Sequence, residues 1–124
     1  MQPMDQAMLS RAIVRKHRAL CMAFPETSEA SSWGHPNFRA GRRTFSTFEI
    51  VRGRPSIAFR LNAVDVGLLL RRKNFFATPY GKGCWVSVWV DARVDWRLVE
   101  RLLARSYRTV ATRRMIRVLD RPPA

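Results

Sequence analysis

NFRAGRRTFSTFEIVRGRPSIAFRL, residues 37–61, is the stretch of the sequence that decides the fold. Three runs within it have the composition of β-strands: residues 37–40, 44–51 and 56–61. In the last run Ile57, Phe59 and Leu61 alternate with smaller or polar residues and so share one face. The runs are separated by two turn-forming tripeptides, Gly41-Arg42-Arg43 and Gly53-Arg54-Pro55. The stretch therefore predicts a meander of antiparallel hairpins.

Helical patterns flank this meander on both sides. Residues 4–24 place their apolar side chains on one arc of a helix, and Pro25 is a stop signal. Three further helices are predicted over residues 63–72, 96–108 and 113–119, with Asn62, Asp95 and Thr112 as their N-terminal caps. In the first of these three, Val66, Leu69 and Leu70 are the expected core positions.

The order of the elements indicates the fold class. Residues 26–36 and 74–83 have the composition of loops. Residues 84–90, CWVSVWV, predict a central strand because their apolar side chains fall on both faces. The sequence thus predicts an α+β fold with a mostly antiparallel sheet, a meander plus one central strand, and helices packed on one face. We expect a single domain over 1–124, with its core at about 4–120.

The composition is that of a globular protein with an unusual charge. Of the 124 residues, 47% are hydrophobic and 26% are charged, which argues against wholesale disorder. The formal net charge is +14. The segments 1–24, 25–61, 62–90 and 91–124 carry +3, +3, +3 and +5, so the excess is spread over the whole chain. Because no basic tail accounts for the excess, we expect the folded surface itself to be basic. Such a surface favours polyanionic partners, nucleic acid first.

The cysteines and histidines are too few and too scattered to indicate a cofactor or metal site. Cys21 and Cys84 stand far apart, no CxxC motif is present, and His17 is expected to be a packed or half-exposed residue rather than a ligand. We therefore expect no metal, no cofactor and two reduced thiols in a cytoplasmic protein. No apolar run approaches 18 residues, so we expect no membrane-spanning segment.

Four stretches resemble the MmcQ/YjbR-like family in order and spacing. They are LCMAFPETSEASSWGHPNFR (20–39), RPSIAFRL (54–61), FFATPYGKGCWVSV (75–88) and VDWRLVERLLARSYRTVA (94–111). The resemblance covers about residues 8–120, although the turn between Tyr80 and Trp85 is a residue shorter than usual and has Cys84 where glycine is common. The resemblance implies a compact, frataxin-like α+β fold, sometimes described as a double wing, and a DNA-binding protein. A family likeness of this kind indicates fold better than function.

Arginines form the candidate nucleic-acid surface. Two pairs lie at the predicted hairpin tips, and four more lie on the helix 96–108: Arg42, Arg43, Arg52, Arg54, Arg97, Arg101, Arg105 and Arg108. The tips lie at opposite ends of one strand, roughly 26 Å apart, so they cannot share a small-molecule site. The four helical arginines form one stripe with only Glu100 as an opposing charge. We therefore expect phosphate contacts with nucleic acid, DNA ahead of RNA, and little sequence specificity.

Two alternatives remain at this stage. The first is a pocket for a small molecule or an anion, with or without catalysis, formed by Trp33, His35, Tyr80, Lys82 and Trp85. The more ordinary interpretation of these residues is a turn and its aromatic anchors, and no residue is assigned a catalytic role. The second alternative is an adaptor whose basic face binds an acidic protein. The sequence sets no oligomeric state.

Overall fold

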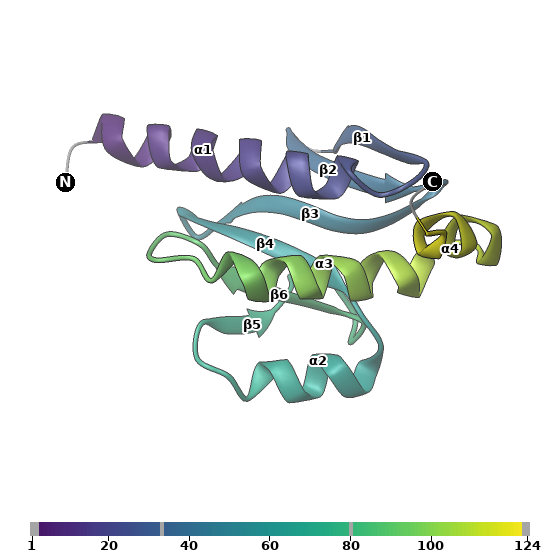
Figure 1. Cartoon of the computed structure of the whole chain (residues 1–124). Helices are drawn as coiled ribbons and strands as arrows, with labels where there is room; N and C mark the ends of the chain where they lie inside the picture. Colours follow the sequence, from purple (N-terminus) through teal and green to yellow (C-terminus); the bar gives the residue numbers. More distant parts are fainter. Residues whose placement is uncertain (1–2, 33, 80, 123–124) are drawn as a thin grey trace.

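The chain forms four helices and one six-stranded sheet, an α+β fold, in a computed structural model that describes residues 3–32, 34–79 and 81–122 (Figure 1). In chain order the elements are α1 (Pro3–Met22), β1 (Thr27–Ser32), β2 (His35–Ala40), β3 (Arg43–Val51), β4 (Arg54–Arg60), α2 (Ala63–Leu70), β5 (Phe75–Ala77), β6 (Trp85–Trp89), α3 (Trp96–Val110) and α4 (Arg113–Asp120). Among the described helices, none has the length and apolar character needed to cross a membrane.

The sheet has the strand order β1-β2-β3-β4-β6-β5, and every neighbouring pair is antiparallel. The predicted meander is therefore confirmed as β2, β3 and β4. Strand β6 lies between β4 and β5, which confirms that it is an internal strand. Helices α1 and α3 cross the same face of the sheet, with α2 below α3 in the view of Figure 1.

A β-bulge interrupts the pairing of β2 with β3. Phe38 pairs with Ser46 and Arg39 pairs with Thr44, so Phe45 has no partner across the ladder. A bulge of this kind changes the alternation of side chains along the strand. As a result the neighbouring residues Phe45 and Ser46 are both completely buried.

Strands β1 and β5 lie where the sequence predicted loops. Strand β1 has the polar sequence TSEASS, and it is a strand because all six of its residues pair with β2. Strand β5 has three residues and pairs with β6 at the other edge of the sheet. Both are edge strands, each held by hydrogen bonds to one neighbour. Such a strand does not need the alternation of apolar and polar side chains that marks an interior strand, so its sequence signal is weaker.

The predicted caps are confirmed, and the helix boundaries shift by a few residues. The side chains of Asn62, Asp95 and Thr112 accept hydrogen bonds from backbone N–H groups three residues later, at 2.8, 3.1 and 3.2 Å. Helix α2 ends at Leu70 instead of residue 72, and Leu70 is 41% exposed, so the prediction that it is buried was wrong. Only Val66 and Leu69 of α2 are fully buried, because a helix this short turns only one narrow stripe inward.

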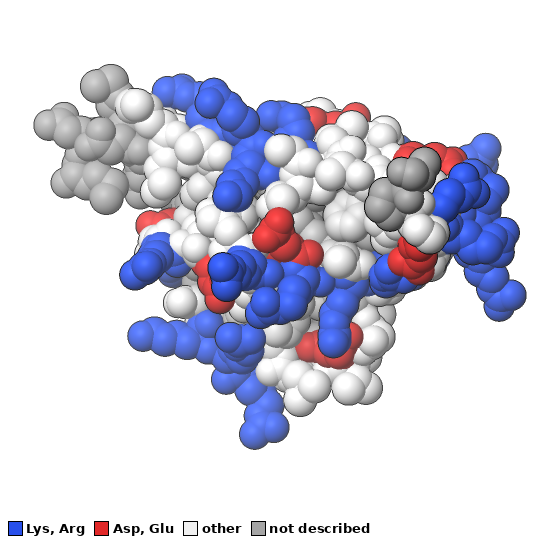
Figure 2. All heavy atoms as spheres, viewed as in Figure 1, with Lys and Arg blue, Asp and Glu red and all other residues white. Residues whose placement is uncertain are grey.

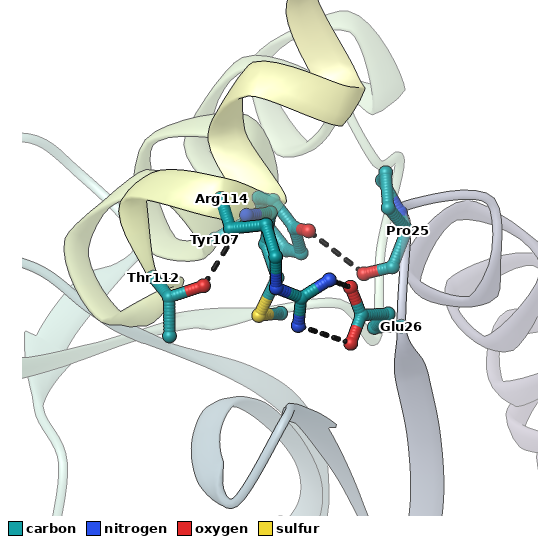
Figure 3. Close-up of polar contacts among 6 residues, drawn as sticks. Pro25, Glu26, Tyr107, Thr112 and Arg114 are labelled. Carbon is teal, nitrogen blue, oxygen red and sulfur yellow. Dashed lines mark hydrogen bonds and ion pairs between the residues drawn. The ribbon is translucent and has the colours of Figure 1, made fainter.

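Tyr107 of α3 joins three parts of the fold. Its ring stacks on Phe24 with a centroid distance of 4.7 Å and meets the edge of Phe45, in the bulge, at 5.7 Å. Its hydroxyl donates a hydrogen bond of 2.7 Å to the carbonyl oxygen of Pro25 (Figure 3). Next to this bond, Arg114 of α4 forms a two-contact ion pair with Glu26, one contact at 2.8 Å. The segment after α1 is thus fixed to both C-terminal helices.

Removing the Tyr107 hydroxyl is expected to destabilise the whole domain. Y107F keeps the ring packing but leaves the partly buried Pro25 carbonyl without its donor. We expect the free energy of unfolding to fall by about 1–3 kcal/mol, measured by urea denaturation.

T109V is the matched control on the same helix. The Thr109 hydroxyl also donates to a carbonyl, that of Arg105 at 2.8 Å, but on the exposed surface. Its removal is expected to change stability by no more than about 0.5 kcal/mol. Equal losses in the two variants would show that the contact between elements adds nothing to an ordinary surface hydrogen bond.

Candidate functional site

The helix-bearing face of the protein is rich in basic side chains. Figure 2 shows lysine and arginine over α1, along α3, at α4 and near α2, with acidic side chains between them. Among the described side chains, five acidic residues pair with an arginine; they are Glu26, Glu29, Asp65, Asp91 and Asp120. The paired arginine holds the pKa of the carboxyl groups of Glu26, Glu29, Asp91 and Asp120 below their usual values. The acidic residues therefore neutralise particular arginines by ion pairing, while other arginines keep an unpaired charge.

The arginine stripe of α3 is divided in this way. Arg105 lies 3.1 Å from Asp65 of α2, and Arg108 forms a two-contact pair with Asp120 of α4. The expectation that only Glu100 opposes the stripe was therefore wrong, because other helices supply the partners. Within the described part of the chain, Arg97 and Arg101 are exposed and have no carboxylate partner.

The two hairpin tips lie at opposite ends of β3, as predicted. Arg42 and Arg43 are exposed at the tip between β2 and β3. At the other tip, Arg52 and Gly53 both have positive φ, 51° and 77°, as a two-residue turn of type I′ requires. Arg54 follows this turn and makes two hydrogen bonds to Asp91, at 2.5 and 3.2 Å. Arg54 is thus an ion-paired residue of the sheet rather than a free cation.

Trp89 is enclosed between Phe76 and Arg54. The Phe76 ring stacks on it at 4.0 Å between centroids, and the Arg54 guanidinium carbon lies 4.0 Å from the ring centroid. Two groups this close cannot share one face of the indole, so they occupy opposite faces. Trp89 therefore has no free face on which a nucleic-acid base could stack.

The alternative pocket is only partly visible in the described residues, because Trp33 and Tyr80 lie outside them. Trp85 lines a cavity of about 130 Å³, and Thr47, Glu49, Thr78, Pro79 and Gly81 also line it. Ser46, the neighbour of Thr47 in β3, faces His17 of α1, so Thr47 points to the face of the sheet away from the helices. Ser87 shares this face because both residues pair with Ala58, and Thr78 bonds to Ser87 at 2.8 Å. The cavity therefore lies on the face without helices. His35 and Lys82 are not among its lining residues.

The comparison with known proteins now identifies the family. The family model named YjbR matches residues 22–109, which is more than half of the chain. The chain belongs to the YjbR family. The resemblance found in the sequence motifs is thereby confirmed.

Two solved structures share the fold of this YjbR-family chain. The Deinococcus radiodurans protein DR2400, with a DUF419 domain, superposes with a TM-score of 0.69 and 20% identity over 88% of each chain. A Pseudomonas syringae protein gives a TM-score of 0.60 and 14% identity over 68% of this chain and 87% of its own. At these identities the likeness concerns the fold alone. Among curated proteins, none matches the chain.

The described residues of this YjbR-family chain contain no cluster of three or more His, Cys, Asp or Glu side chains that could hold a metal ion. Cys21 and Cys84 are both unpaired, the first buried and the second half-buried. Burial raises the pKa of the Cys21 thiol far above its usual value. A buried, protonated thiol is a poor nucleophile, so Cys21 is a packing residue.

His17 is completely buried and neutral. Its Nε2 lies 2.9 Å from the hydroxyl of Ser46, and that hydroxyl donates its own hydrogen to the Ala58 carbonyl oxygen at 2.7 Å. His17 must therefore carry its proton on Nε2 and donate it to Ser46. Burial, assisted by the charge of Arg18, lowers the pKa of His17 to about 3. Of the two expected states of His17, packed or half-exposed, the structure shows the packed one.

This buried histidine is expected to make the fold sensitive to acid. The folded pKa of about 3 lies below the ordinary 6.5, so the unfolded chain takes up the proton first as the pH falls. The stability that neutral His17 provides is complete above pH 6.5 and is lost progressively towards pH 3. This group alone should remove about 1.4 kcal/mol per pH unit between pH 6 and 4, measured by urea denaturation.

H17Q separates this effect from the surface carboxylates. The glutamine amide can still donate to Ser46 but does not titrate. The carboxylates of Glu26, Glu29, Asp91 and Asp120 lose their pairs in acid in both proteins, so they cancel in the comparison. The variant should show the shallower acid slope; identical slopes would mean that His17 does not titrate in the unfolding reaction.

Proposed function

We propose that this YjbR-family chain binds duplex DNA through phosphate contacts with little sequence specificity. The observation that carries the proposal is the net charge of +14 together with the exposed, unpaired Arg97 and Arg101 in the described part of α3. A stripe of cations matches a phosphate backbone, whose negative charges recur along its whole length. DNA is preferred over RNA because of what the family resemblance implies. The cytoplasm, where thiols such as Cys21 and Cys84 stay reduced, is the proposed location.

The proposed footprint centres on α3. This helix has 15 residues and is about 22 Å long, which is enough to follow several phosphates of one strand. Arg97 and Arg101 are its free cations, while the ion pairs of Arg105 and Arg108 weaken the attraction at the other end. Arg54 belongs to the other face of the sheet, where Asp91 and Trp89 hold it, and it is left out of the footprint.

Low specificity follows from what the footprint lacks. The exposed stripe of α3 carries guanidinium groups, which contact phosphates along the backbone. On the other face of the sheet both faces of the Trp89 ring are covered, so this ring offers no platform for base stacking either. The small-molecule alternative has less support, because neither His35 nor Lys82 lines the cavity at Trp85.

Binding to mixed-sequence duplex DNA should be steeply salt-dependent. Four to six phosphate contacts predict a slope of about −4 to −5 in a plot of log affinity against log salt concentration. The R97Q/R101Q variant should bind all sequences more weakly, and its slope should be shallower by about two. Fluorescence anisotropy across a salt series measures both quantities.

The R105Q/R108Q variant is the matched control. It lies on the same helix and changes the net charge equally, but it removes guanidinium groups that Asp65 and Asp120 already engage. Its affinity loss should be smaller than that of R97Q/R101Q. Equal losses would indicate diffuse attraction without a footprint, and a flat salt response or no binding at low salt would exclude the proposal.

A further inference from the structure

A groove of about 340 Å³ runs between α2 and α3. Its floor is apolar and is formed by Leu68, Leu69, Leu98 and Leu102. Its rim is basic and is formed by Arg72, Arg101 and Arg105, with Asp65 as the single acidic residue. Asp65 already pairs with Arg105, so the rim as a whole attracts negative charge. The groove thus combines an apolar floor with a cationic rim.

A second, smaller cavity extends this groove. It has a volume of about 140 Å³ and shares Arg72, Leu98 and Leu102 with the first. Its walls continue the same pattern, with the apolar side chains of Phe75 and Val88 and the cations Lys73 and Arg93, and Asp95 is its acidic residue. The leucine floor and the basic rim therefore continue beyond α2 to the N-terminal end of α3.

Helix α2 is apolar on the side that faces away from the core as well. Val66 and Leu69 are buried, yet Val64 is 72% exposed and Leu68 is 57% exposed. Apart from Asp65, α2 is apolar all round, and a helix of this kind is normally covered on both sides. The outward side of α2 therefore has the composition of a surface that meets another molecule.

The chemistry of the groove selects among the possible occupants. DNA phosphates match the rim but gain nothing from a leucine floor. A second copy of the chain would bring a charge of +14 against another of +14. A flat bilayer does not enter a concave groove. An amphipathic helix with acidic flanks satisfies both the floor and the rim.

We propose that the α2–α3 groove binds an acidic amphipathic helix of a partner protein. Apolar residues of that helix at positions i, i+3, i+4 and i+7 lie on Leu68, Leu98 and Leu102, and its carboxylates face Arg72, Arg101 and Arg105. This binding goes beyond the proposed contact with DNA. Because Arg101 belongs to both surfaces, the partner helix and DNA compete for the protein.

Two synthetic peptides test the proposal directly. The first is a labelled 16-residue helix with leucine at i, i+3, i+4, i+7 and i+11 and glutamate or alanine elsewhere; the second has the same composition in scrambled order. Measured by fluorescence anisotropy near physiological salt, the patterned peptide should bind at least tenfold more tightly. Equal affinities would reduce the interaction to charge alone and overturn the proposal, as would the absence of binding by either peptide.

Two leucine variants on one helix locate the site. L68Q changes the groove floor and should weaken binding of the patterned peptide by about tenfold. L70Q changes a residue of the same type on α2, similarly exposed, that does not line the groove, and it should leave the affinity unchanged. Because Leu68 is 57% and Leu70 41% exposed, both variants should fold, which thermal melts can verify. Equal effects of L68Q and L70Q would overturn the assignment.

Binding to duplex DNA separates this proposal from the preceding one. L68Q should leave DNA affinity unchanged, while R101Q should lower the affinity for the patterned peptide and for DNA. If L68Q weakened DNA binding as much as peptide binding, the groove would be part of the DNA surface and the proposal would fail. If DNA did not bind at all but the patterned peptide did, only the proposed DNA contact would be lost.

Discussion

The packing of Tyr107 is the contact on which the rest of the structure depends. The ring joins Phe24 at the end of α1 to Phe45 in the bulge of β3, and the hydroxyl reaches Pro25, 82 residues away in the chain. Closing a loop of this length costs conformational entropy, which the buried aromatic area and the hydrogen bond together offset. Because Glu26 follows directly and pairs with Arg114, the same corner also positions α4. The outer surface of α3 therefore has a fixed orientation relative to the sheet.

Local signals explain which parts of the fold the sequence predicts. Turn residues and capping side chains act within three or four positions, so the meander and the starts of three helices could be located from them. Strand β1 carries no such signal, since TSEASS is a strand only through its partner β2. The bulge at Phe45 likewise depends on pairing rather than on any single residue. What the sequence misses is set by contacts between elements.

The same distinction applies to the candidate surface. Helical periodicity correctly places Arg97, Arg101, Arg105 and Arg108 on the exposed side of α3, but it considers only charges within that helix. The partners Asp65 and Asp120 come from α2 and α4, and only the tertiary structure shows which arginines they hold. The groove beside Leu68 is of the same kind, because two helices far apart in the sequence form its walls. A partial signal is present in the sequence of α2, AVDVGLLL, which is apolar apart from Asp65.

The composition of the two edge strands has a consequence for self-association. An unpaired strand edge is a template on which other chains can add, and long apolar edges lead to aggregation and fibrils. Here one edge, β5, has only three residues, and the other, β1, is polar. Glu29 of β1 also carries the bidentate ion pair with Arg18, at 2.6 and 2.9 Å, so a strand added there would approach a charged pair. The sheet therefore terminates at both edges in strands that resist polymerisation, although its interior strands are rich in phenylalanine and valine.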